Sequence, residues 1–242
     1  MDEAGIDKAL VFAGRMNSIT TEQVIEEIEP YKGRLYAIGA ASPEQGEGTQ
    51  AGLTFLHSLE EYLKSGLIRG LKFYPGYEHY YPADGWLRPF LELLVKYDRP
   101  AIFHSGDTFS KVGEAKLKYA LPIHIDDLAT DLPELKIIIA HLGYPWQREA
   151  AEVVYKNKNV YADCSGFVYG DFTQKLDTDY RHVWNEFIQI AGGFDKILFG
   201  TDWPISNQGS YVRQIVNLVE STRDSQVGSE VLSGNAIKLF GL

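Results

Sequence analysis

The sequence predicts an α/β fold in which buried parallel strands alternate with helices. Short apolar runs bounded by glycine or proline recur along the chain, and they are apolar on both faces, as strands covered by helices are. Amphipathic segments separate these runs, with a repeat of roughly 25 to 35 residues that is typical of βαβ units. No GxGxxG follows any of the runs, which removes the main support for an open dinucleotide-binding sheet. We therefore expect a TIM-type (β/α) barrel, and since no linker interrupts the pattern, a single domain over residues 1–242.

The individual elements follow from the same pattern. Predicted strands are the apolar runs at residues 8–12, 34–40, 68–73, 99–104, 135–141, 159–165 and 195–202. Predicted helices are the amphipathic segments at residues 20–31, 58–66, 87–97, 123–133, 147–157 and 181–193. The tail, residues 231–242, predicts a last helix with Ile237, Leu239 and Phe240 as its apolar contacts.

The beginning of the sequence is consistent with a barrel that is one strand short. Residues 3–5 resemble the last turn of a helix closing on Gly5, and a strand is predicted over residues 6–12. An eight-stranded barrel needs about 250 residues and eight units, whereas seven strands are predicted here. We therefore expect the first strand of the barrel to lie ahead of Met1.

Composition excludes several classes of function. The chain is 45% hydrophobic and 23% charged, as globular proteins are. A net charge of −10 without a run of Lys or Arg argues against nucleic-acid binding. The first residues are acidic, so we expect no signal peptide, and no apolar run in this sequence approaches the length of about 18 residues that a membrane span needs. The single cysteine, Cys164, excludes an intrachain disulfide framework and fits a reducing cytoplasm. We expect a cytoplasmic protein that acts on a small molecule and binds neither nucleic acid nor membrane.

Ionisable residues end five of the predicted strands: Lys72, His104, His141, Asp163 and Asp202. In a barrel, the carboxyl ends of the strands surround one mouth, where active sites are built. A charged side chain buried there without a partner costs several kcal/mol, so each of these residues needs a partner or a ligand. The pattern predicts an active site at the mouth.

The histidines each have a functional and a structural interpretation. His104 is a candidate metal ligand, or a core histidine bonded to the backbone. Asp107 is a candidate to orient His104 through its carboxylate, or to cap the next segment. His141 repeats the arrangement of His104 one unit later, which favours a functional role for both. His124 lies in a helical stretch or at its entrance and is a candidate to lean over the mouth; the remaining histidines are interpreted as surface or structural residues.

The other polar residues also leave two interpretations open. Asp202 is a candidate to bind a divalent cation or to take a proton from water, or else it caps the following helix. Lys72 is a candidate to hold a substrate carboxylate, or it is a solvated rim lysine. Asp163 and Ser165 are interpreted mainly as caps, and Cys164 as a small buried residue rather than a nucleophile. The aromatic loop of residues 73–86 predicts either a lid or pocket wall or a packing loop.

Four motifs in order, FHSGD, AHLG, VYADCSG and ILFGTDWP, resemble the amidohydrolase-2 family of metal-dependent TIM-barrel hydrolases. This family includes aminocarboxymuconate-semialdehyde decarboxylase and γ-resorcylate decarboxylase. The resemblance covers nearly the whole chain, down to GNAIKLFGL, which is similar to the closing helix of the family.

The resemblance implies roles for particular residues. His104 matches the metal-binding histidine of the family's fifth strand, and Asp202 matches the eighth-strand aspartate that ligates metal or acts as acid or base. His141 matches the sixth-strand histidine that binds or polarises the substrate. Lys72 lies on the strand that matches the fourth, where some related enzymes place a bridging lysine. The implied cofactor is a divalent metal, zinc or alternatively manganese, and residues near Trp203 are expected to set the substrate.

The sequence departs from the family at one point. Family members carry a His-x-His pair on strand one that supplies two metal ligands, and no His-x-His occurs in this sequence. Residues 8–12 would then match strand two, and Met1 would fall in the preceding helix. We therefore expect metal to bind weakly or to be absent, with His141 or His124 as replacement ligands. The two unpaired strand edges favour a homo-oligomer.

Four hypotheses about function follow. The first is a metal-dependent hydrolase that acts on a small carboxylated or cyclic substrate through metal-activated water. The second and third keep the superfamily but change the reaction, to a non-oxidative decarboxylase or to a metal-free lactonase. The fourth is an incomplete, catalytically inactive barrel that only binds ligands or partners.

Overall fold

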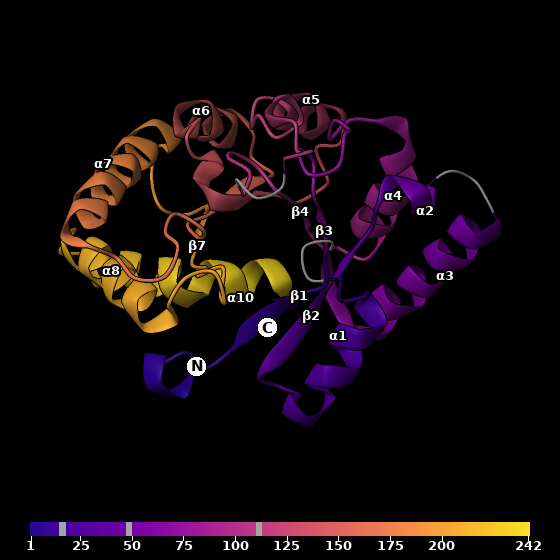
Figure 1. Cartoon of the computed structure of the whole chain (residues 1–242), viewed down its shortest axis with the longest axis horizontal. Helices are drawn as coiled ribbons and strands as arrows, with labels where there is room; N and C mark the ends of the chain where they lie inside the picture. The colour runs from indigo at the N-terminus through magenta and orange to yellow at the C-terminus, as the bar shows by residue number, and fades with distance from the viewer. Residues whose placement is uncertain (15–17, 47–49, 110–112) are drawn as a thin grey trace.

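The computed structural model describes residues 1–14, 18–46, 50–109 and 113–242. Its described strands form one parallel sheet in sequential order, and Figure 1 shows that the helices lie around the outside of the curled sheet. The strands are β1 Ala9–Phe12, β2 Leu35–Ala40, β3 Ile68–Phe73, β4 Ala101–Phe103, β5 Ile137–Ile139, β6 Val160–Asp163 and β7 Ile197–Leu198. Each lies inside or closely matches a predicted strand, which confirms the predicted α/β (β/α)-barrel fold.

The described helices alternate with these strands. They are α1 Thr21–Ile28, α2 Pro43–Gly46, α3 Gln50–Ser65, α4 Arg88–Lys96, α5 His124–Asp131, α6 Gln147–Lys156, α7 Gln174–Ala191, α8 Gln208–Glu220, α9 Ser225–Ser229 and α10 Asn235–Phe240. Short 3₁₀ turns lie at Asp2–Ala4, Glu29–Tyr31, Gly85–Leu87, Leu117–Tyr119 and Ala140–Gly143, and a π-helical turn lies at Glu230–Gly234.

Five described helices differ from the sequence prediction. The helices α3 and α7 begin at Gln50 and Gln174, well before the predicted starts, and α2, α8 and α9 were not predicted. Thr173 caps α7 by accepting a hydrogen bond from the Leu176 N–H at 3.3 Å, and Asn207 caps α8 in the same way. The prediction relied on closely spaced apolar residues, whereas polar capping residues set the starts of α7 and α8.

Strand register places the strand-end residues on the inner face of the sheet. Lys72 pairs with Ile102, Ile102 pairs with Ile138, and Ile138 pairs with Tyr161. Residues paired across parallel strands share a face, and residues two apart on one strand share it too. Lys72, His104 and Asp163 therefore point into the barrel.

The lower part of the interior is filled by apolar side chains. Ile38, Ile102, Ile138 and Leu198 form one buried cluster with residues of α10, namely Leu239 and Phe240. Arg99, which precedes β4, donates from Nη1 to the Phe240 carbonyl oxygen at 2.7 Å, so α10 closes the amino ends of the strands. The prediction for Leu239 and Phe240 is confirmed. That for Ile237 is wrong, because this residue is 43% exposed.

The first residues form a short turn rather than a long helical end. The turn Asp2–Ala4 closes on Gly5, whose φ of +67° is the left-handed conformation that glycine adopts easily. The strand that follows begins at Ala9, one residue after the start of the predicted apolar run of residues 8–12. The turn packs against α8, and among the described strands β1 and β7 each pair on one side only.

Within the described part of the chain, no helix combines the length and apolar character required to cross a membrane.

Candidate functional site at the carboxyl ends of the strands

The structure brings the five strand-end residues together. The rings of His104 and His141 lie with their centroids 5.3 Å apart, and the His141 backbone N–H donates to Asp163 Oδ1 at 3.1 Å. The carboxylates of Asp163 and Asp202 act on the ammonium group of Lys72, where they oppose the effect of burial. Residues from β3, β4, β6 and the ends of β5 and β7 thus form one polar cluster at the mouth.

His104 is held by the backbone and keeps one nitrogen available. Its ring is 6% exposed, and Nε2 lies 2.9 Å from the Asp107 carbonyl oxygen. A carbonyl oxygen only accepts, so Nε2 carries the proton and Nδ1 keeps its lone pair in the neutral ring. Burial lowers the pKa of His104 well below its ordinary value, and the neighbouring His141 and Lys72 lower it further. The structural and ligand interpretations of His104 are therefore compatible.

The turn that positions His104 depends on Gly106. Gly106 has a φ of +99°, and a Cβ there would lie 2.1 Å from the Tyr144 carbonyl oxygen. The same oxygen accepts the Asp107 N–H at 2.8 Å, which fixes the turn after β4 to the loop after β5. The prediction that the Asp107 carboxylate orients His104 is wrong. The backbone carbonyl oxygen of Asp107 makes this contact instead.

His141 occupies an unusual backbone conformation. Its φ is +62°, and Leu142 after it has a φ of +51°, a region that non-glycine residues rarely adopt. Asp202 shares this feature with a φ of +59°. Such conformations cost free energy and cluster at functional sites, where hydrogen bonds hold them in place. For His141 these bonds go from its N–H to Asp163 and from Nδ1 to Ser165 Oγ, the latter at 2.9 Å.

Asp163 and Ser165 form part of the cluster and are not helix caps. Asp163 Oδ1 accepts the Ser165 N–H at 3.0 Å and also the Ser165 hydroxyl, and the following helix is capped by Thr173 instead. The bond from the Ser165 N–H caps the segment after the strand, as the sequence interpretation expected, and the same carboxylate also belongs to the cluster. The Asp-x-Ser spacing carried a usable signal, because side chains two positions apart on an extended segment lie on one face.

Cys164, between these two residues, is a buried structural residue, as predicted. Burial raises the pKa of its thiol to about 12, which leaves little reactive thiolate at neutral pH. Its carbonyl oxygen accepts the hydroxyls of Tyr180 and Tyr211 at 2.7 and 2.8 Å. These bonds fix the strand end on which Asp163 and Ser165 lie.

Lys72 is a buried lysine, so its interpretation as a solvated rim residue is wrong. Its side chain is 6% exposed, and Nζ lies 5.8 and 5.7 Å from the ring centroids of Phe12 and Tyr74. In the described ranges, no hydrogen bond or ion pair reaches its ammonium group. Burial lowers the pKa of Lys72, and the carboxylates of Asp163 and Asp202 partly reverse this effect. An ammonium group with three unused donors between aromatic rings suits an anionic ligand.

Asp202 also lies in the cluster and does not cap the next helix. Its carbonyl oxygen accepts the Ile205 N–H at 2.9 Å in a tight turn, while Asn207 caps α8. Burial raises the pKa values of Tyr74 and Tyr77, and the charge of Asp202 raises both further. The carboxylate of Asp202 therefore acts on the same aromatic residues that surround Lys72 and His104.

His124 and Trp203 are the remaining predicted site residues. His124 begins α5, where Nε2 lies 2.9 Å from the Lys118 carbonyl oxygen and the ring packs against Tyr81. Trp203 is 65% exposed on the loop after β7. In the loop of residues 73–86, the buried Tyr80 hydroxyl accepts the Tyr74 N–H at 2.8 Å, and Tyr77 packs on His104. This loop is a packed wall of the site.

The polar cluster contains donor atoms of the kind that bind metals, but too few of them. Among the described residues, no group of three or more His, Cys, Asp or Glu side chains is placed to hold a metal ion. Catalytic zinc usually has three protein ligands, and His104 with Asp202 supplies only two. His141 does not complete the set through Nδ1, because Ser165 occupies that atom. The described residues therefore do not fit a complete metal site.

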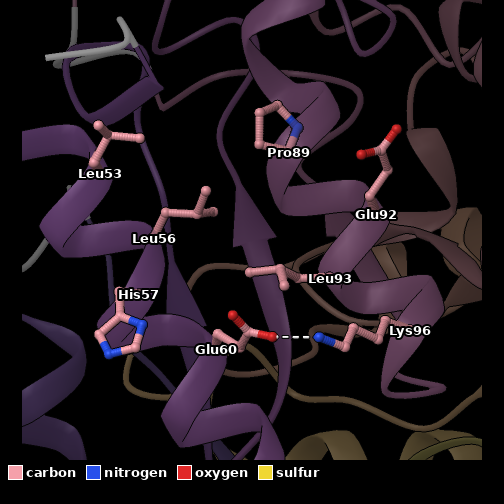
Figure 2. Close-up of a pocket in the computed structure, with 8 residues that line it drawn as sticks. All are labelled: Leu53, Leu56, His57, Glu60, Pro89, Glu92, Leu93 and Lys96. Carbon is pink, nitrogen blue, oxygen red and sulfur yellow. Dashed lines mark hydrogen bonds and ion pairs between the residues drawn. The ribbon is translucent and has the colours of Figure 1, made fainter.

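Two surface grooves are lined by residues of the outer helices and not by residues of the strands. Figure 2 shows a groove of about 400 Å³ between α3 and α4, with Leu56 and Leu93 on its walls and the Glu60–Lys96 ion pair across it. A second groove, of about 420 Å³, lies between α8 and the residues of α9 and the π-helical turn. Neither includes a strand-end residue, so the chemistry of the mouth is not located in these grooves.

The solved structures most relevant here share the fold of this chain. An uncharacterised TIM-barrel protein from Bordetella bronchiseptica matches with a TM-score of 0.77 and 22% identity, covering 100% of this chain and 80% of that one. A probable 2-pyrone-4,6-dicarboxylic acid hydrolase from Acinetobacter baumannii, with citric acid bound, matches with a TM-score of 0.68 and 18% identity. This match covers 100% of this chain and 86% of that one. A 5-carboxyvanillate decarboxylase from Novosphingobium aromaticivorans, with manganese bound, matches with a TM-score of 0.70 and 15% identity. This match covers 100% of this chain and 79% of that one.

Sequence comparison gives the family directly. No curated protein matches the chain significantly. The model of the amidohydrolase family Amidohydro_2, in contrast, matches residues 1–242. Together with the curled sheet of parallel strands and the polar cluster at its carboxyl ends, this match over the full chain shows that the protein belongs to the Amidohydro_2 amidohydrolase family.

Proposed function

We propose that the protein hydrolyses a small cyclic substrate that carries a carboxylate. The observation that supports this most strongly is Lys72, a buried lysine whose ammonium group makes no hydrogen bond or ion pair with a described residue and which lies in one cluster with two groups able to move protons. Lys72 holds the carboxylate of the substrate. His141 and Asp202 are the two groups that we propose for moving a proton between the attacking water and the leaving oxygen.

Both the similar structures and the residues of the site support a cyclic substrate with a carboxylate. One of them is described as a 2-pyrone-4,6-dicarboxylic acid hydrolase, whose name combines a ring ester with carboxylates. Tyr74 and Tyr77 beside Lys72 and His104 suit a flat ring. We expect the setting to be cytoplasmic and the partner to be a small molecule, in line with the net charge of −10.

The metal is a separate part of the proposal. His104 and Asp202 are the two donors that we propose for a divalent metal, and manganese is bound in one of the similar structures. Because no third donor joins them in the described part of the chain, we expect weak binding, and no step of the reaction is derived through a metal.

The test is an assay of the purified chain with 2-pyrone-4,6-dicarboxylate, 5-carboxyvanillate and 2,6-dihydroxybenzoate. Ring opening of the pyrone, with KM raised at least tenfold in Lys72→Met, is the expected result. Release of CO₂ from the benzoates without ring opening would select decarboxylation instead. No turnover of any compound, with or without added zinc or manganese, would contradict the proposal and favour the inactive barrel.

Metal dependence is decided in the same assay. Turnover that survives a chelator selects the metal-free lactonase, whereas loss of turnover with chelator and recovery with manganese or zinc selects the metal-dependent hydrolase. The metal content of the protein as isolated, measured by mass spectrometry, shows whether occupancy is below one ion per chain, as two ligands imply.

A further inference from the structure

Asp163, Ser165 and His141 form a chain of hydrogen bonds with a defined direction. Asp163 Oδ1 receives the His141 N–H at 3.1 Å, the Ser165 N–H at 3.0 Å and the Ser165 hydroxyl. A serine hydroxyl has one hydrogen, and here it is donated to the carboxylate. Ser165 Oγ can then only accept from His141 Nδ1, 2.9 Å away. The proton of the neutral imidazole must therefore lie on Nδ1.

We propose that Ser165, held by Asp163, is a positioning residue that fixes His141 in the tautomer protonated at Nδ1, so that Nε2 carries the lone pair. Nε2 makes no hydrogen bond to a described residue. It is the atom of this ring that is available to a ligand.

Two backbone features bring the ring to Ser165. A Cβ at Gly166, whose φ is +75°, would lie 2.4 Å from His141 Nδ1, so a side chain there would displace the ring. The φ of +62° at His141 turns the chain sharply at the end of β5, and the bond to Asp163 holds this conformation. Glycine at position 166 and the left-handed residue at 141 thus serve the same contact.

The neighbouring histidine has the opposite tautomer. His104 donates from Nε2 to the Asp107 carbonyl oxygen at 2.9 Å, which leaves its lone pair on Nδ1. The two rings lie 5.3 Å apart between centroids, and each presents one unprotonated nitrogen. The site therefore offers two neutral acceptors that are fixed by different hydrogen bonds.

The Nδ1-protonated tautomer changes the role expected for His141 in the reaction. The role described next rests on the proposed function. A neutral ring with its lone pair on Nε2 cannot donate a hydrogen bond from that atom, so it does not polarise a substrate carbonyl. It acts as a base instead. The water oxygen bonds to the ester carbon while one water proton passes to Nε2; the ring C–O bond then breaks, and the same proton passes to the leaving oxygen. The net change is the addition of one water molecule.

The test reads the tautomer directly in the full chain. The histidine rings are labelled with ¹⁵N, and the two-bond ¹H–¹⁵N spectrum is recorded at a pH where His141 is neutral, with His141→Gln to assign its signals. We expect a protonated Nδ1 and an unprotonated Nε2 in the native protein. In Ser165→Ala the ratio of the two tautomers should fall about fivefold or more, the effect of one lost neutral hydrogen bond. Ser165→Thr, which keeps the hydroxyl, should restore the ratio.

Ser105 provides a matched control, since it is another buried serine that follows a strand of the sheet. Ser105 is buried, and its hydroxyl donates to the Ala120 carbonyl oxygen at 3.1 Å without contacting an imidazole ring. Ser105→Ala should leave the His141 tautomer ratio unchanged. A native His141 protonated at Nε2 overturns the proposal without any variant, and so does an unchanged ratio in a folded Ser165→Ala.

Activity separates this inference from the proposed function. With a substrate that turns over, Ser165→Ala should lower kcat at least tenfold with KM changed less than twofold, and Ser165→Thr should recover most of it. If no compound in the assay turns over, the proposed function fails, while the spectra still decide the tautomer.

Discussion

Lys72 carries a positive charge into the inner face of the sheet, where Phe12 and Tyr74 pack around its ammonium group. The usual reason to keep such a group is a ligand, because burial without a partner opposes folding. Its effects on stability and on binding should therefore have opposite signs.

Lys72→Met is expected to raise the free energy of unfolding at neutral pH by about 1–2 kcal/mol, since it replaces a buried cation by an apolar side chain of similar length. The pKa of Lys72 is lowered by burial, so between that value and the ordinary lysine pKa the unfolded chain binds more protons than the folded one. Wild-type stability rises with pH across this window, and the advantage of the variant should shrink there. Urea unfolding at several pH values measures this.

The control for this prediction is Lys175→Met, on the exposed side of α7, which should leave stability within about 0.5 kcal/mol of wild type. A Lys72→Met protein that is clearly less stable than wild type at neutral pH would mean that the ammonium group has a stabilising partner.

Individual residues also show where sequence reasoning succeeded and failed. Position at a strand end was enough to select Lys72, His104, His141 and Asp202. It did not identify Ser165, whose role depends on an imidazole from another strand. It wrongly favoured a contact from the Asp107 carboxylate, because sequence does not reveal whether a side chain or the backbone of a turn faces the neighbour.

At the scale of elements, the turns after the strands are built around glycine. The turn of residues 104–107 allows no side chain at Gly106, which lies against the Tyr144 backbone with a positive φ. This turn sets the position of His104 and ties it to the loop that carries His141.

Gly106→Ala is therefore expected to destabilise the protein by about 2–4 kcal/mol, because the added methyl group would overlap a backbone oxygen in a strained conformation. Gly85→Ala is the matched control, since a Cβ there meets nothing within 4 Å and its φ is not positive. Thermal unfolding of both variants measures the difference. Equal melting temperatures for the two would show that the turn can relax without cost.

The elements themselves were predicted well where an apolar period was strong. All seven observed strands were anticipated, because each is a short apolar run. The helix α8 was missed, although Tyr211, Ile215, Leu218 and Val219 are buried at helical spacing. Polar residues between these positions and the cap at Asn207 make this period weak in sequence.

For the whole molecule, the described sheet has two edge strands. Among the described strands, β1 and β7 have one neighbour each, and β7 spans only Ile197–Leu198. Backbone amides on an unpaired strand edge exchange their hydrogens with solvent easily, and such an edge favours association. We therefore propose that any self-association uses these edges.

Hydrogen exchange followed by mass spectrometry should therefore show the slowest exchange in β3, β4 and β5 and faster exchange in β1 and β7. If association covers the edges, protection of β1 and β7 should rise with protein concentration while β4 stays unchanged. Protection of β1 equal to that of β4 in dilute solution would contradict this order.

The sequence by itself determined the succession of strands and helices, the residues at the strand ends and the family, because these depend on local apolar patterns and short motifs. Only the tertiary structure decided which of those residues act together. The burial of Lys72 and the direction of the Asp163–Ser165–His141 chain depend on contacts between different strands. Such contacts follow from the curvature and register of the sheet, which no local pattern specifies.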